Sequence, residues 1–141
     1  MIREVEAFGL RPASAEINPA NGRTLINFDT VFYTTAAEYQ FRLPNLGPGV
    51  DIIATPARYT WHFGDGQTKV TDEPGRPYPH LDITHEYENT GTRQIRVDVD
   101  YQVQWNAGGG WQTIAQTIPG QQGPSTSLTV LENDPVLSRN R

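Results

Sequence analysis

Hydrophobic and polar side chains alternate along several stretches of this chain, which is the pattern of β-strands with one buried face. The longest such stretch runs from Thr92 to Trp105. Its apolar positions share one face: Ile95, Val97, Val99, Tyr101, Val103 and Trp105. We expect that face to be buried and the opposite, polar face to contact water.

A second clear stretch, Ala57 to Phe63, puts aromatic side chains on one face and Arg58, Thr60 and His62 on the other. The remaining predicted strands are a short one within 12–19, a buried one over 24–35, and others over 39–43, 50–54, 111–118 and 125–131. Pro56 is expected to end the strand over 50–54, because proline cannot donate to a strand ladder. No stretch of ten residues or more has the helical period, so the sequence predicts an all-β domain.

Two loops stand out between the predicted strands. Residues 67–81 are irregular, and the prolines at 74, 77 and 79 exclude a helix or a central strand there. Arg76, Tyr78 and His80 make this loop a candidate interaction surface.

The second loop, 106–110, contains three consecutive glycines and is typical of a hairpin. Trp105 and Trp111 flank it. We expect these two rings to pair across the strands and to cap one end of the domain. If they are exposed, they form instead an aromatic platform for a glycan or a protein.

Composition fits one domain of many turns. The 141 residues include 13 glycines and 11 prolines, and they suffice to bury a core. We expect an arm over 1–11, a domain over 12–131 and a polar tail over 132–141. The absence of cysteine excludes disulfides and cysteine-ligated metal.

The net charge and the hydropathy pattern exclude some classes of binding partner. The net charge of −5 argues against binding to nucleic acid, and no apolar run reaches the length of a membrane span. Residues 1–6 carry Glu4 and Glu6 where a signal peptide has basic and apolar regions. Two hypotheses stay open: an exported protein without its leader and with an artificial first methionine, or a protein not exported by a signal peptide.

The motif Trp61-His62-Phe63-Gly64-Asp65-Gly66, followed by a His-x-Tyr strand and a Gly-Thr pair, resembles the polycystic-kidney-disease (PKD) domain family. The positions that match its pattern are Trp61, Phe63, Gly64, Asp65, Gly66, His85, Tyr87 and Gly91. The resemblance covers about residues 50–105. It implies an immunoglobulin-like β-sandwich of about 7–9 antiparallel strands, in which these residues have structural roles.

The chain departs from the family pattern at two places. His62 stands where the family commonly has an aspartate, and the loop after Gly66 is longer than usual. An Asn-Phe-Asp-Thr stretch before the motif and a Pro-Gly-x-Pro-Tyr-Pro loop after it resemble PKD-containing exported proteins of actinobacteria.

Metal binding is not expected. His62, His80 and His85 would have to converge with an aspartate, and we expect instead one packed or turn-bonded histidine, His85, and two surface ones. Asp98 and Asp100 share a face and could hold Ca²⁺ with another oxygen donor. No Asp-x-Asp-x-Asp-Gly loop accompanies them, so a solvated polar face is favoured.

Catalysis is not expected either. The serines lie near the chain ends, none lies in a Gly-x-Ser-x-Gly turn, and no glycine loop opens a helix. We therefore predict no enzyme activity and no cofactor. The expected function is an extracellular or cell-surface module that binds protein or carbohydrate or acts as a spacer. The alternative is a structural protein of a virion, such as a bacteriophage head-decoration or tail subunit, with a capsid as its partner.

Overall fold

The computed structural model describes residues 13–19, 22–36, 38–43, 49–114 and 117–132. Within these ranges the regular elements are strands, and none is a helix. The strands are β1 (Glu16–Asn18), β2 (Arg23–Leu25), β3 (Thr30–Tyr33), β4 (Tyr39–Leu43), β5 (Val50–His62), β6 (Thr68–Thr71), β7 (Thr84–His85), β8 (Gly91–Asn106), β9 (Gln112–Thr113), β10 (Ile118–Gln122) and β11 (Thr126–Leu131). The expected arm over 1–11 and all of the tail except Glu132 lie outside the described residues.

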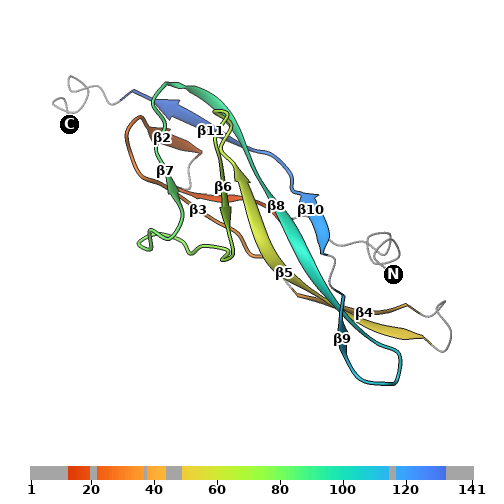
Figure 1. Ribbon diagram of the computed structural model, residues 1–141. Helices are drawn as coiled ribbons and strands as arrows, with labels where there is room; N and C mark the ends of the chain where they lie inside the picture. Colours follow the sequence, from red (N-terminus) through yellow and green to blue (C-terminus); the bar gives the residue numbers. More distant parts are fainter. Residues whose placement is uncertain (1–12, 20–21, 37, 44–48, 115–116, 133–141) are drawn as a thin grey trace.

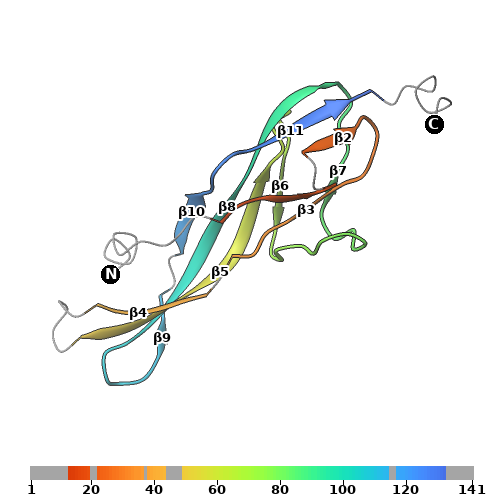
Figure 2. The ribbon, with the colours of Figure 1, turned by 180° about the vertical axis from the view of Figure 1, so that it is seen from behind.

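Strands β5 and β8 form the central ladder of the larger sheet, whose order is β2-β11-β8-β5-β4. Strand β6 pairs with the second half of β5, while β9 and β10 pair with β8. Strands β5 and β8 run along the molecule, with β2 and β11 at one end and β4 and β9 at the other (Figures 1 and 2). The smaller sheet has the order β1-β3-β7.

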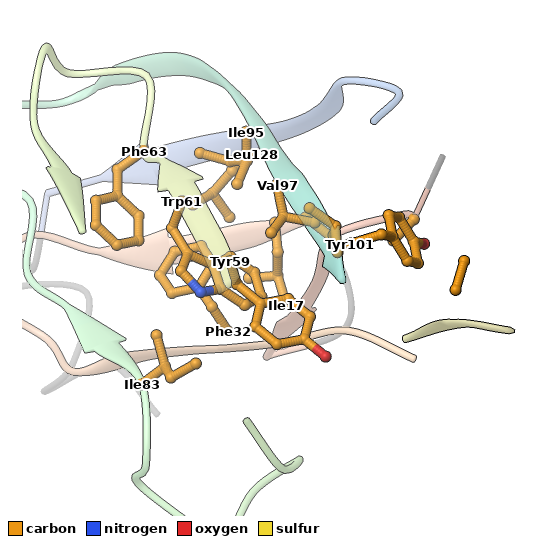
Figure 3. Close-up of a cluster of buried hydrophobic side chains, with 14 of the residues drawn as sticks. Ile17, Phe32, Tyr59, Trp61, Phe63, Ile83, Ile95, Val97, Tyr101 and Leu128 are labelled. Atoms are coloured by element: carbon orange, nitrogen blue, oxygen red, sulfur yellow. The ribbon is translucent and has the colours of Figure 1, made fainter. Parts of the chain in front are cut away.

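The core lies between the two sheets. The alternating face of β8 is buried as expected from Ile95 to Val103, whereas Trp105 is only partly buried. Phe32 of β3 packs against the ring of Trp61 in β5 and against the ring of Phe63, the residue after β5, at centroid distances of 6.3 Å and 4.9 Å. Figure 3 shows these rings together with Ile83 and Leu128. The architecture is the predicted all-β sandwich.

The structure corrects the prediction that Pro56 ends a strand. Strand β5 continues through Pro56 for 13 residues, and its register against β8 shifts between Pro56 and Arg58. Pro56 lies opposite Tyr101, and Ala57 is the extra residue of the β-bulge beside it. Bulges are among the places where a sheet tolerates proline.

The predicted buried strand over 24–35 is also wrong, because it is two strands separated by a turn. Asn27 has a φ of 57°, in the left-handed region, and it ends β2 before β3 begins in the other sheet. Phe28, which the predicted strand over 24–35 included, lies in this turn and is 47% exposed.

Four smaller differences concern the number, bounds and pairing of the strands. The loop predicted over 67–81 contains the edge strand β6, and the partner strand predicted over 111–118 is divided between β9 and β10. The described residues form eleven strands rather than 7–9. Strand β2 pairs with β11 in parallel, which an all-antiparallel sandwich does not predict.

A search of the described residues finds no helix long and apolar enough to cross a membrane.

Candidate interaction site

The Gly-Asp-Gly turn after β5 is held by Asp65. Its Oδ1 accepts the Gln67 amide hydrogen at 3.0 Å, and its Oδ2 lies 2.7 Å from Nε2 of His85. The His85 ring stacks on Phe63 at 4.0 Å and meets the ring edge of Tyr87. The aspartate and histidine of the motif therefore bind each other and the core.

The environment of Asp65 stabilises its charged form. Burial acts to raise the pKa of this carboxyl, but the hydrogen bonds from His85 and the Gln67 amide, with the attraction of His85, outweigh burial. The pKa of Asp65 consequently lies below its ordinary value.

Two further polar groups of the motif are also used internally. The Tyr87 hydroxyl donates to the Phe63 carbonyl at 2.7 Å, and burial raises the pKa of that hydroxyl. The Trp61 indole donates to Oγ1 of Thr71 at 3.1 Å, which ties β5 to the edge strand β6. Through these hydrogen bonds, Tyr87 and Trp61 hold neighbouring segments of the fold together.

The outer face of the β5–β8 ladder carries an ion-pair cluster around Asp98. One of its carboxylate oxygens lies 2.9 Å from Nε2 of His62, and the other accepts from Nε of Arg96 at 3.1 Å. In the described part of the chain, no three His, Cys, Asp or Glu residues form a group that could hold a metal ion. Both carboxylate oxygens of Asp98 are therefore engaged by side chains of the same sheet.

Hydrogen bonds hold the loop over 72–82, both within the loop and to Asn18 of β1. Arg76 donates two hydrogen bonds to the carboxylate of Asp82, at 2.7 Å and 3.0 Å, and the Tyr78 amide donates to Oδ1 of Asn18. The Tyr78 side chain is 70% exposed, and His80 is exposed as well. All three loop residues predicted to form a surface are thus at the surface.

The two tryptophans of the hairpin do not form the expected pair. Trp105 lies opposite Gln112 in the register and packs partly against the core. Trp111 is 47% exposed. The 72–82 loop and the β8–β9 hairpin lie at different places on the molecule in both views (Figures 1 and 2), so the predicted residues do not make one surface.

A depression of about 520 Å³ lies beside Tyr78. Its lining is mostly apolar and comprises Asn18, Pro19, Phe28, Asp29, Val31, Tyr78 and Leu81. A second depression of about 270 Å³ shares Pro19 and Phe28 with it and extends to Leu25 and Leu131. We call these two adjoining depressions the apolar groove.

The apolar groove collects most of the large hydrophobic side chains that the fold leaves in water. Among the described residues six are exposed, and four of them line this groove: Phe28, Tyr78, Leu81 and Leu131. The other two, Val70 and Trp111, lie elsewhere. The groove is therefore the place where exposed apolar side chains gather among the described residues.

Sequence reasoning found Tyr78 but missed the other exposed groove residues. Phe28 was placed inside a strand, although Asn27 and Asp29 on either side of it are turn residues and were the available signal. Leu81 and Leu131 carry no local signal, because they join the groove only through the packing of distant segments.

Comparisons with known proteins agree with the fold and the motif. The family model for the PKD domain matches residues 29–108 of this chain. No curated protein and no solved structure matches this chain. The narrower resemblance to exported actinobacterial proteins therefore stays a prediction.

Proposed function

This chain belongs to the PKD domain family, and from that premise we propose that it is a non-enzymatic interaction module of an extracellular or cell-surface protein. It binds a protein or a carbohydrate through the apolar groove. The observation that carries the proposal is the gathering of Phe28, Tyr78 and Leu81 around one depression. Full burial of each such side chain contributes about 1.5–3 kcal/mol, so covering even part of this surface favours association.

The chemistry of the groove supports binding rather than catalysis. Asn18 is committed to the fold, since its Oδ1 accepts from Tyr78 and its Nδ2 donates to the Ile17 carbonyl. Among the described residues that line the larger depression, Asp29 carries the one carboxylate. An apolar surface with one carboxylate at its border suits the docking of a partner.

The test uses fluorescently labelled protein and intact cells of the organism that encodes it. We expect surface labelling that falls at least about fivefold with Phe28→Ser or Tyr78→Ser. Val70→Ser is the matched control, because Val70 is 58% exposed on β6 outside the groove. Labelling that is absent, or that is equal for all three variants, contradicts the proposal.

A structural subunit of a larger assembly, such as a virion, is the second candidate. The observation that favours it is a second exposed aromatic, Trp111, on a hairpin away from the groove. A subunit that bridges neighbours needs two surfaces, and in this candidate Trp111 belongs to the second. Co-purification with capsid proteins, reduced by Trp111→Ser as well as Phe28→Ser, would support this candidate.

A further inference from the structure

The apolar groove continues into a depression of the opposite character. Asp29 lines the groove and also a neighbouring depression of about 340 Å³ that carries Glu86 and Glu88. We call this neighbour the acidic depression. One surface therefore changes from apolar to acidic across a single residue.

The three carboxylates lack cationic partners. Within the part of the chain that the structure describes, Asp29, Glu86 and Glu88 make no ion pair and no side-chain hydrogen bond. By contrast, Asp51, Asp65, Asp82 and Asp98 each lie against an arginine or a histidine. His85 also lines the acidic depression, but its Nε2 is engaged by Asp65.

The carboxylates gather at one end of this surface, in the acidic depression. A cation on a ligand is therefore attracted at that end. The surface as a whole is complementary to a ligand with one apolar part and positive charge on one side of it.

We propose that the apolar groove and the acidic depression together bind a linear peptide segment of a partner protein, in which an apolar anchor has arginine or lysine residues on one side. This inference rests on the proposed function and specifies its ligand. The anchor occupies the groove beside Phe28 and Tyr78, and the cations lie over Glu86 and Glu88. A neutral carbohydrate would leave the three carboxylates without a partner, so charge complementarity selects the peptide.

The experiment measures fluorescence anisotropy of labelled ten-residue peptides with the full chain near pH 7. The basic probe carries a Phe-Leu pair with two arginines on one side, made in both orders so that either chain direction is represented. The acidic probe has glutamates in place of the arginines, and the polar probe has serines in place of Phe-Leu. We expect the basic probe to bind about tenfold more tightly than the acidic probe, with affinity falling as salt is raised.

Two sets of variants locate the binding. Phe28→Ser is expected to weaken the basic probe at least about fivefold, and the control Val70→Ser to leave it unchanged. The double variant Glu86→Gln/Glu88→Gln is expected to remove the difference between basic and acidic probes. Asp100→Asn, which removes a carboxylate on β8, is the matched charge control and should preserve that difference.

The outcomes separate this inference from the function on which it rests. If chito- or cello-oligosaccharides bind in a Phe28-dependent way and no peptide binds at about 1 mM, the groove function stands and the peptide inference is overturned. Equal binding of the basic and acidic probes overturns it as well. If Phe28→Ser changes no binding, both proposals fail. Self-association that Phe28→Ser abolishes would make a second copy the occupant and overturn the partner peptide.

Discussion

Asp65 joins two segments of the chain that lie 20 residues apart. One of its oxygens holds the amide of Gln67 within the turn, and the other holds His85, whose ring covers Phe63. A histidine hydrogen-bonded to an aspartate is common in catalytic sites, but this pair is mostly buried. The side-chain exposures of His85 and Asp65 are 11% and 18%. Its contacts show that it fixes the turn to the neighbouring strand.

The first prediction concerns the charge of Asp65. Asp65→Asn should lower the free energy of unfolding at pH 7 by about 1–2 kcal/mol, because a charge-assisted hydrogen bond is weakened. Since the pKa of Asp65 is lowered in the folded protein, its contribution is complete above about pH 4, the ordinary aspartate value. The contribution is lost as the pH falls through the lower folded pKa.

Urea unfolding from pH 7 to about pH 3 measures this effect. The stability difference between the natural chain and Asp65→Asn should narrow below about pH 4. Asp72→Asn, in the exposed loop, is the control and should show no comparable difference at any pH. A difference for Asp65→Asn that stays constant over the whole range would show that the charge is not responsible.

The inward-facing residues were the most predictable part of the molecule. Trp61, Phe63 and Tyr87 are buried to within 1% of full burial. Alternation indicates the buried face for Trp61 and Phe63, and the family pattern gives all three a structural role. Phe28 shows the limit of that reasoning. A phenylalanine between Ile26 and Val31 reads as part of a buried strand, and only the left-handed backbone of Asn27 turns it outward.

At the scale of elements, the turn between β5 and β6 offers a matched pair of glycines. Gly64 and Gly66 both have positive φ, at 82° and 90°. A Cβ on Gly64 would lie 2.8 Å from the Gln94 carbonyl oxygen and 2.9 Å from the Gln94 nitrogen, whereas a Cβ on Gly66 would meet nothing within 4 Å. The two positions therefore differ in their neighbours and not in their backbone region.

We predict that Gly66→Ala costs about 1 kcal/mol of folding free energy, for the left-handed backbone alone. Gly64→Ala should cost about 3 kcal/mol, because the turn must also move away from β8. Paired thermal or urea unfolding of the two variants measures the difference. Equal costs would mean that the approach of the turn to Gln94 is not tight.

The lengths of the strands were harder to predict than their existence. Pro56 is a sound reason to end a strand, but pairing with β8 on one side carries β5 through a bulge. Strand β6 was missed because the stretch Thr68–Thr71 is short, mostly exposed and without a core face. In both cases pairing with another strand decides whether the residues form a strand, and the preferences of the residues themselves do not.

On the scale of the whole molecule, the apolar groove is assembled from segments far apart in the sequence. The turn after β1, the turn after β2, the long loop before β7 and the end of β11 each contribute exposed apolar groups. No local pattern marks such a site, since each residue alone reads as an ordinary surface or strand position. The sandwich was predictable from alternation, while the groove depends on how its loops meet.

The same long-range packing should make the sandwich one cooperative unit. Phe32 of the smaller sheet lies against Trp61 of the larger one and against Phe63 just after β5, and its amide donates to the Ile83 carbonyl at 2.9 Å. Opening either sheet alone would expose these rings to water. We therefore expect the two sheets to unfold together.

Native-state amide hydrogen exchange tests this expectation. Amides of Val97 and Phe32, one in each sheet, should exchange only through global unfolding, with the same free energy and the same dependence on denaturant. Amides of Gln112 and Thr113 should exchange at least about a hundredfold faster, because β9 is exposed and short and pairs with the end of β8. Exchange of Phe32 at a lower free energy than Val97, insensitive to denaturant, would show instead that the smaller sheet opens by itself and that the ring contacts do not couple the layers.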